Sequence, residues 1–365
     1  MTPVWWAQII AVIRLETKKT FFAKRGLWVY LLALMPVVLF LGHAIVVGHQ
    51  NQARVRLASK NERPLTHQDL AGIANGMTRQ EVIQRLGKTP VAYSWDERGD
   101  GPNSSRIVVH DTYEYSDGVF ELYIRMEGGK VTGTTLGDGE TLGEDSMVFA
   151  GVFQFFYLRL AVFFGCLGIF MNLFRGELLD KSLHFYFLAP IRRDILMAGK
   201  YLAGLVAATV IFTTSTALQI IALAWSVDPN ALNAYLYHGH GFADGLSYLG
   251  ITLLACVGYG SFFLAAGLLF RNPILPAAGV LIWEALNPFL PAVLQKISII
   301  YYLKSLCPVE VPADPGTHPL VALFISNPDP ISAPIAIAGV IMVSLLVLFV
   351  SSFKVRRMEI NYTTE

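Results

Sequence analysis

Residues 246–270 read LSYLGITLLACVGYGSFFLAAGLLF and contain no Asp, Glu, Lys or Arg. A helix needs about 20 apolar residues to cross the hydrocarbon core of a bilayer, so this run is long enough to span a membrane. Five other stretches are comparably long and apolar, and the six run near residues 27–47, 147–173, 201–226, 246–270, 274–296 and 331–353. We therefore expect six transmembrane helices, the first of them a retained anchor.

The composition agrees with a membrane protein. Of the 365 residues, 54% are hydrophobic and 15% are charged, whereas a soluble globular domain has about 25% charged residues. The formal net charge of +1 gives no bulk attraction to nucleic acid, and we expect no nucleic-acid partner. The cysteines Cys166, Cys256 and Cys307 are scattered, so neither a disulfide framework nor a Cys-x-x-Cys metal site is expected.

The placement of the basic residues predicts the orientation in the membrane. Lys and Arg are frequent in the leader 1–26, in the connection 174–200 and in the tail 354–365, whereas residues 227–245 contain neither. Short cytoplasmic loops are enriched in Lys and Arg. We therefore expect both termini and the connection 174–200 to be cytoplasmic, which requires an even number of crossings.

Residues 50–146 look like a soluble domain, and the predicted topology makes this domain extracytoplasmic. Thr66 and Thr78 each stand three residues before an acid, which is the spacing of a capping box at the start of a helix. Gly87 is suited to end the second helix.

Three strands are predicted after these helices. They cover Ile107–Tyr115, Val119–Met126 and Lys130–Thr135. Asp117-Gly118 and Gly128-Gly129 join them, and such dipeptides accept the positive φ of tight hairpins. The expected fold is thus an all-α polytopic membrane protein with six transmembrane helices and an inserted α+β domain of two helices and a three-stranded antiparallel sheet.

Part of this domain resembles a known family. The run GMTRQEVIQRLGKTP at residues 76–90, Tyr113-Glu-Tyr115 and the strand after Gly-Gly-Lys130 resemble the small lipoprotein domain of the outer-membrane barrel-assembly machinery. The resemblance implies a fold and an extracytoplasmic setting. It does not transfer a function, because one fold hosts many activities.

The connection at residues 174–200 reads FRGELLDKSLHFYFLAPIRRDILMAGK and is rich in aromatic and aliphatic residues. Glu177 and Lys181 are four residues apart and can pair on a short helix, which Pro190 then ends. An apolar surface outside the membrane needs to be buried, either in the groove of a partner protein or in the lipid interface. These residues alone favour neither burial over the other.

Family resemblance distinguishes the two. An acid, a spacer, Leu-Ala-Pro190-Ile-Arg-Arg193 and then Gly199-Lys200 resemble the coupling-helix region of ABC exporter permeases of the type-2 class. Other matching features are the basic leader, Trp283-Glu284 and Tyr301-Tyr302-Leu303. The resemblance covers most of the chain outside the inserted domain.

The resemblance implies a transport subunit that is not itself an enzyme. In that family two permease halves, identical or homologous, assemble with two ATPase subunits in the bacterial cytoplasmic (inner) membrane. The coupling helix lies in a cleft of the ATPase, and the leader 1–26 forms an amphipathic helix along the inner lipid interface. Residues at or near the ATPase contact are then Glu177, Leu188, Pro190, Arg192 and Arg193.

No complete Walker sequence is present in the chain. A phosphate-binding loop needs the spacing GxxxxGK[ST], and the Gly-Lys-Thr at residues 87–89 is preceded by Val82 where glycine is required. ATP and Mg²⁺ are therefore expected on the partner ATPase, and no cofactor or metal on this chain.

Arg159 and Glu284 are ionisable residues within predicted crossings, each near mid-membrane. A charge at that depth costs several kcal/mol unless it is paired or hydrated. We predict that the two face each other or a common cavity, either as a structural ion pair or as part of the conduit. The remaining interpretation is that they reach to the lipid interface.

The stretch 274–296 contains Pro276, Pro288 and Pro291 beside Asn287, and this pattern breaks a helix. The short re-entrant helices of the family imply a turn over Asn287 to Leu303 that dips into the membrane and returns. The alternative is a single kinked helix. In the preceding stretch, Gly258, Gly260 and Gly267 are typical of close helix packing, within one chain or across a dimer.

The function predicted from the sequence is that of a permease subunit of an ATP-binding-cassette exporter. Lipid, peptide, drug, polysaccharide and sodium are all compatible cargoes. The alternative is a membrane-anchored receptor or assembly scaffold whose outer domain binds an envelope partner. An ion-driven carrier is a third class, but such carriers usually contain internal repeats, and we find none in the sequence.

Overall fold

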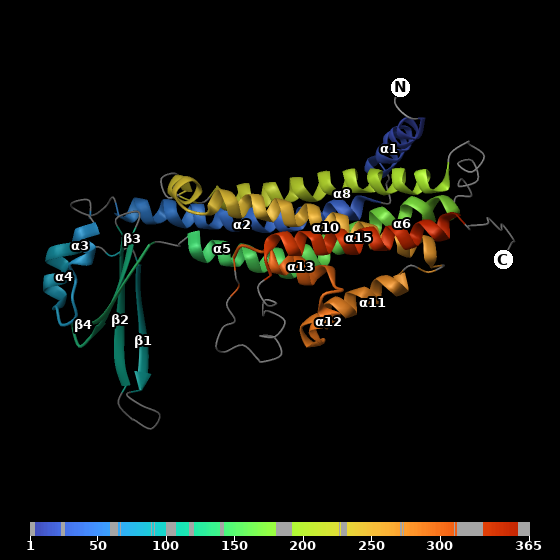
Figure 1. Cartoon of the computed structure of the whole chain (residues 1–365). Helices are drawn as coiled ribbons and strands as arrows, with labels where there is room; N and C mark the ends of the chain where they lie inside the picture. Colours follow the sequence, from blue (N-terminus) through green and yellow to red (C-terminus); the bar gives the residue numbers. More distant parts are fainter. Residues whose placement is uncertain are drawn as a thin grey trace. The chain divides into compact units, whose positions relative to one another are not determined.

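Five long helices dominate the computed structural model of the chain (Figure 1). The structure describes residues 4–22, 26–58, 65, 67–88, 90, 92–99, 107–116, 120–138, 142–179, 192–225, 227, 232–270, 272, 274–309, 311 and 331–356. The chain divides into two units, Met1–Leu41 with Ser146–Glu365, and Gly42–Asp145.

The five long helices are apolar enough to cross a membrane and match five of the six predicted stretches. They are α2 (Leu27–Ala58), the continuous run of α5 (Leu142–Gly151), the π-helix η2 (Val152–Val162) and α6 (Phe163–Leu179), then α8 (Arg193–Ala224), α10 (Gly241–Leu269) and α15 (Ala333–Arg356). Their length and apolarity are compatible with a membrane location.

The stretch 274–296 is not one long helix, so the prediction of six transmembrane helices is not confirmed. It forms the short helix α11 (Ile274–Ala285), which is followed by η4 (Asn287–Phe289), α12 (Ala292–Gln295) and α13 (Ile299–Ser305). At 1.5 Å per residue α11 is about 18 Å long, well short of a hydrocarbon core of about 30 Å. Pro288 and Pro291 lack the amide hydrogen that would continue the helix. The alternative of a single kinked helix is therefore wrong.

The direction of the helices follows from contacts at one end of the bundle. Lys200 near the start of α8 donates to the carbonyl of Leu173 in α6 at 2.9 Å. Arg356 at the end of α15 is 3.3 Å from Asp194 of α8, and a side-chain carbon at Gly267 of α10 would lie 3.2 Å from the backbone of α6. Helices α6, α10 and α15 thus end where α8 begins. Because α10 and α15 run in the same direction, the chain between them has to come back to the other end of the bundle before α15 begins.

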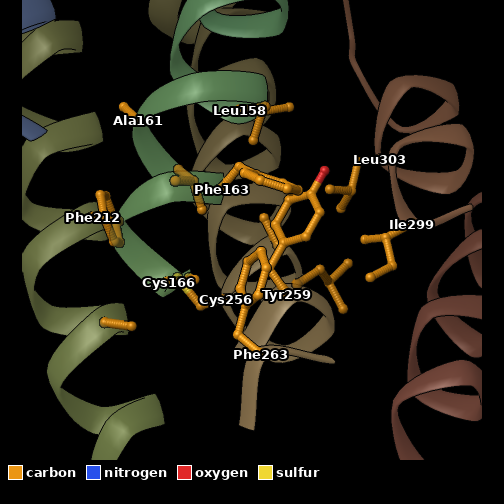
Figure 2. Close-up of a cluster of buried hydrophobic side chains, with 14 of the residues drawn as sticks. Leu158, Ala161, Phe163, Cys166, Phe212, Cys256, Tyr259, Phe263, Ile299 and Leu303 are labelled. Carbon is orange, nitrogen blue, oxygen red and sulfur yellow. The ribbon is translucent and has the colours of Figure 1, made fainter. Parts of the chain in front are cut away.

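Aromatic side chains fill the centre of this unit. The ring of Phe163 lies edge-on to Phe263 at 4.9 Å and to Tyr259 at 5.3 Å, and Figure 2 shows this cluster with Leu303 near the hydroxyl end of Tyr259. A side-chain carbon at Gly258 would lie 2.8 Å from Ile299. The glycine therefore lets α10 approach α13 closely, and this packing lies within one chain.

The leader is a helix, α1 (Val4–Phe22), which packs on α8. The two helices come close at Gly199, where a side-chain carbon would be 2.9 Å from Val12. Val12 itself is 4% exposed. The absence of a side chain at Gly199 therefore allows this contact.

The unit Gly42–Asp145 contains a four-stranded antiparallel sheet in the order β1-β2-β3-β4. Its elements are α3 (His67–Ala71), α4 (Arg79–Leu86), β1 (Ala92–Gly99), β2 (Ile107–Ser116), β3 (Phe120–Glu127) and β4 (Lys130–Asp138). The prediction of three strands is wrong in number, because it contains β2 to β4 and misses β1. In β1, Asp96, Glu97 and Gly99 belong to residue types that are depleted in strands.

The predicted cap at Thr78, the helix end at Gly87 and the turn at Gly128-Gly129 are confirmed. Thr66 and Asp117-Gly118 lie outside the described residues. Thr78 and Glu81 form a reciprocal capping box at the start of α4, and Gly87 ends this helix with φ of 93°. Gly128 and Gly129 join β3 to β4 with φ of 57° and 80°. Helices and sheet bury a common core of Leu65, Leu70, Ile73, Val82, Leu86, Tyr113, Tyr115, Leu122, Ile124, Met126 and Val131.

Candidate coupling and intramembrane sites

Three of the five predicted coupling residues lie at the two ends of the connection between α6 and α8. Glu177 is in the last turn of α6, Arg192 caps the start of α8, and Arg193 is its first residue. Leu188 and Pro190 lie outside the described residues. The structure thus describes the two ends of the connection at residues 174–200.

Charged side chains join the start of α8 to the end of α15. Asp194 Oδ2 is 2.9 Å from Arg192 Nη2 and 3.3 Å from Arg356 Nη2. Arg193 Nη1 donates to the main-chain carbonyl of Arg356 at 3.2 Å. The Arg192 side chain is 73% exposed, so its ion pair contributes at most about 1 kcal/mol and its remaining donors are accessible to a partner.

A buried ion pair joins α1 to α8 a short distance along the bundle. Lys200 Nζ lies 2.8 Å from Glu16 Oε1 and donates to the carbonyl oxygen of Leu173 at 2.9 Å. The exposed fractions of the Lys200 and Glu16 side chains are 0% and 4%. A buried charge needs such partners, because removal from water costs several kcal/mol per ion. One lysine therefore ties the leader, the end of α6 and the start of α8 together.

Sequence reasoning missed this pair. It treated Lys200 as one more basic residue of a cytoplasmic flank and Glu16 as part of a basic leader. One signal was present, since Glu16 is the only acidic residue before residue 62. The partner of that acid lies 184 positions away, and a separation of this size has no local pattern.

The second predicted site is the intramembrane charge Glu284. Its side chain is 4% exposed. Glu284 Oε2 accepts a hydrogen bond from the hydroxyl of Tyr259 at 2.8 Å, and Oε1 accepts one from the amide of Ile300 at 3.4 Å. The carboxylate therefore connects α11, α10 and α13, and these donors offset part of the cost of its burial.

Arg159 lies on the π-helix η2, a type of helix that is rare and often found at functional sites. Its guanidinium carbon is 5.5 Å from the ring centre of Phe155, and Lys304 Nζ is 5.5 Å from the same ring. Both contacts are within the range of cation–π interactions. Two cations, one from η2 and one from α13, thus lie near the same aromatic ring.

The predicted meeting of Arg159 and Glu284 stays a prediction. The two residues lie on η2 and α11. Within the described residues, however, no distance of 4.0 Å or less joins them, and Arg159 Nε has no hydrogen-bond acceptor. The direct partner of Glu284 is Tyr259. Nothing in the sequence distinguishes this tyrosine from the others in apolar stretches.

The predicted turn residues form a compact reversal of the chain. Asn287 begins η4, is 6% exposed, and donates through Nδ2 to the carbonyl of Gln295 at 3.2 Å. Gln295 Nε2 donates to the carbonyl of Leu290 at 2.9 Å, and Pro291 caps α12. The side-chain amides thus bind carbonyl groups that a broken helix leaves without partners.

In the part of the chain that the structure describes, no group of three or more His, Cys, Asp or Glu side chains is placed to hold a metal ion. The chemistry that the described contacts show at these sites is that of charges and hydrogen bonds. It can fix helix ends and tether elements together.

The chain was compared with known proteins. No protein-family model matches it, no curated protein sequence is similar to it, and no solved structure resembles it at a significant level.

Proposed function

We propose that the chain is the permease subunit of an ATP-binding-cassette exporter that works with a second permease half and a separate ATPase. Residues 174–200 would dock on the ATPase through Leu188, Pro190 and Arg192. The observation that carries the proposal is the buried pair of Glu16 and Lys200 with the Leu173 carbonyl, together with the sequence resemblance. This contact would hold the helix ends beside residues 174–200 in place while the ATPase pushes on that segment.

The proposed mechanism transmits motion through the two ends of that segment. ATP and Mg²⁺ bind on the partner, and closure of the ATPases displaces the coupling segment. Both helix ends are tethered, α6 to α8 by Lys200 and α8 to α15 by Asp194, so displacement moves these helices as a body. Cargo then passes between two permease halves, whose two states are biased differently by nucleotide and cargo.

The proposed topology has six crossings, of which the fifth is broken. The parallel direction of α10 and α15 favours this topology, because the chain between them must return once along the bundle. Helix α11 would cover one half of that path, and the turn at Asn287 would be the re-entrant part. Both termini are then cytoplasmic in the inner membrane, and the unit Gly42–Asp145 is outside.

The experiment is purification of the complex from membranes. We expect the wild-type chain to co-purify with an ATPase subunit that hydrolyses Mg²⁺-ATP, and Arg192→Glu to remove it. Arg125→Gln, an exposed substitution on the sheet of the outer unit, is the matched control and should retain the ATPase. If Arg192→Glu and the control retain the same ATPase activity, residues 174–200 are not the coupling segment.

The second candidate function is an envelope receptor or scaffold. The observation that favours it is the separate unit Gly42–Asp145 with its own buried core. In this case the purified chain carries an envelope partner and no nucleotide-hydrolysing subunit. Deletion of the outer unit then removes the partner, whereas Arg192→Glu has no effect.

Arg159 and Glu284 are proposed to act together, as an ion pair or as part of the conduit. Charge reversal tests the pairing. Arg159→Glu and Glu284→Arg should each reduce transport, and the double exchange should restore part of it. If the double variant is no better than the single variants, the two side chains do not pair.

A further inference from the structure

The unit Gly42–Asp145 contains a pocket with a volume of about 380 Å³. Its walls come from α4, from Lys88 and Pro90 after this helix, and from strands β1, β2 and β3. The floor consists of Val82, Tyr115 and Met126, which are 2%, 3% and 2% exposed. The hydroxyl of Tyr115 donates to the carbonyl of Gly87 at 3.2 Å. Since this polar group has its partner, the floor offers carbon atoms and an aromatic ring.

The mouth of the pocket has a different character. Arg79 and Lys88 line it, and both are exposed. The guanidinium carbon of Arg79 is 5.4 Å from the ring centre of Tyr113. Within the described residues, neither Arg79 nor Lys88 lies within 4.0 Å of a carboxylate oxygen. The mouth therefore has two cations whose charge these residues do not neutralise by an ion pair.

Asp111 also lines the pocket, so the lining contains two cations and one carboxylate. Asp111 Oδ1 accepts a hydrogen bond of 2.7 Å from the hydroxyl of Tyr93, and the rings of Tyr93 and Tyr113 are 5.0 Å apart. Tyr93 is nevertheless 53% exposed. Its hydroxyl is held by Asp111 while its ring remains uncovered, which makes it a preformed wall for an aromatic or apolar group.

The exposed aromatics continue the face of the sheet that α4 covers. Tyr93 is paired with Tyr113 and Trp95 with Asp111 across β1 and β2, and directly paired residues point to the same face. Trp95 is 62% exposed. The face of the sheet that packs on α4 thus extends beyond this helix, and the pocket lies at the edge of the part that α4 covers.

We propose that this pocket binds a small organic anion, such as a carboxylate on a single aromatic ring or short apolar chain. The anionic group would lie between Arg79 and Lys88, because a guanidinium binds a carboxylate with two parallel hydrogen bonds. The apolar part would enter the floor beside Met126. A volume of about 380 Å³ is at the small end of ligand sites and suits a ligand with one ring or one short chain. This proposal is independent of the transport function.

The experiment uses the full chain in lipid nanodiscs, with empty nanodiscs as the blank. The probe is 4-phenylbutyrate, and its affinity is measured by saturation-transfer NMR titration. The neutral analogue 4-phenylbutanamide has nearly the same shape. We expect the neutral analogue to bind the wild-type chain at least about tenfold more weakly than phenylbutyrate does. The double variant Arg79→Gln, Lys88→Gln should lower the affinity for phenylbutyrate by a similar factor.

Matched variants separate charge from folding. Arg125→Gln removes an exposed cation from the opposite face of the same sheet, since its neighbours Ile124 and Met126 point into the core, and should leave the affinity unchanged. Arg79→Lys should restore part of the affinity. Hydrogen exchange of α4 shows whether each variant is folded.

Several results would overturn the proposal. One is absence of phenylbutyrate binding to the folded wild-type chain, and another is equal binding of acid and amide. A third is displacement of phenylbutyrate by inorganic phosphate at the same concentration as the probe, because the apolar floor would then contribute nothing. A fourth is an equal loss of affinity in Arg125→Gln and in the Arg79 and Lys88 variants. The effect would then come from the net charge of the unit and not from the pocket.

Discussion

Single buried charges define the interior of this protein at the scale of the residue. Lys200 has a carboxylate and a carbonyl as partners, and Glu284 has a hydroxyl and an amide. In each case the partners come from different helices. A charge in this setting therefore specifies which helices meet, because any other arrangement leaves it without partners.

Glu16→Gln tests this reasoning at the buried pair. Removal of one partner leaves a buried charge without full compensation, so we expect the free energy of unfolding in mixed micelles to fall by about 3–5 kcal/mol. The control is Lys19→Gln. Lys19 is 3.9 Å from Glu16 but 51% exposed, so its loss should cost no more than about 1 kcal/mol. Equal effects of the two substitutions would show that the pair with Lys200 has no special weight.

At the scale of the element, close helix contacts depend on residues without side chains. Gly199 and Gly258 stand where α8 meets α1 and where α10 meets α13. The short helices between α10 and α15 depend instead on proline, which ends a helix, and on Asn287 and Gln295, which bind the freed carbonyls. The glycines and the prolines are each single residues, yet they determine how helices that are distant in sequence pack together.

Gly199→Leu is expected to separate α1 from α8. The new side chain meets Val12 at 2.9 Å already at its first carbon, and overpacking of this kind costs about 1–3 kcal/mol. Gly250→Leu is the control, because nothing lies within 4 Å of a carbon added there and leucine favours a helix over glycine. The midpoint of thermal unfolding should fall for the first variant and rise or stay unchanged for the second. A similar fall in both would contradict the close contact.

The capping box of α4 makes a prediction about pH. The backbone amide and the hydroxyl of Thr78 each donate a hydrogen bond to the Glu81 carboxylate. These two hydrogen bonds, the one from the amide more strongly, lower the pKa of Glu81 below its ordinary value of 4.5. A lowered pKa in the folded state stabilises α4 above the unfolded pKa, and this stabilisation is lost as the pH falls through the folded value. Hydrogen exchange of residues 79–86, corrected for the intrinsic rate, should therefore accelerate from about pH 4.5 downward.

Glu81→Gln is the corresponding variant. It removes the titrating group, so the exchange of α4 should depend less on pH in this acidic range than in the wild-type chain. An unchanged pH dependence would mean that Glu81 does not link protonation to the stability of the helix.

At the scale of the whole molecule, the decisive property is whether the number of membrane crossings is odd or even. Five helices are long enough to cross a membrane, and five crossings alone would place the termini on opposite sides. The connection from α10 to α15 returns along the bundle and so supplies the missing passage under the proposed topology. The basic residues of leader and tail agree with it.

Cysteine labelling in intact cells tests this topology. In a chain from which Cys166, Cys256 and Cys307 have been removed, single cysteines at Gln8 and Thr363 should both react with a membrane-impermeant maleimide only after lysis. A cysteine in place of Tyr237, which is 77% exposed, should react before lysis. Reaction of Thr363→Cys in intact cells, with Gln8→Cys still protected, would mean an odd number of crossings.

Features that depend on short-range chemistry could be predicted from the sequence. The five long apolar helices follow from length and composition, and β2 to β4 follow from their turns. The capping box follows from a spacing of three residues between Thr78 and Glu81. Each of these patterns is complete within a few turns or strands, so a single stretch of residues contains its whole signal.

Only the tertiary structure decided the remaining features. The sequence determined that Lys200 is basic and lies at the start of an apolar helix, whereas the fold brought it to Glu16, 184 positions away. Likewise Tyr259 meets Glu284, and β1 pairs with β2 despite its charged residues. The physical reason is that burial and partner choice are properties of the packed whole, in which a polar group is stable only where distant segments complete its hydrogen bonds.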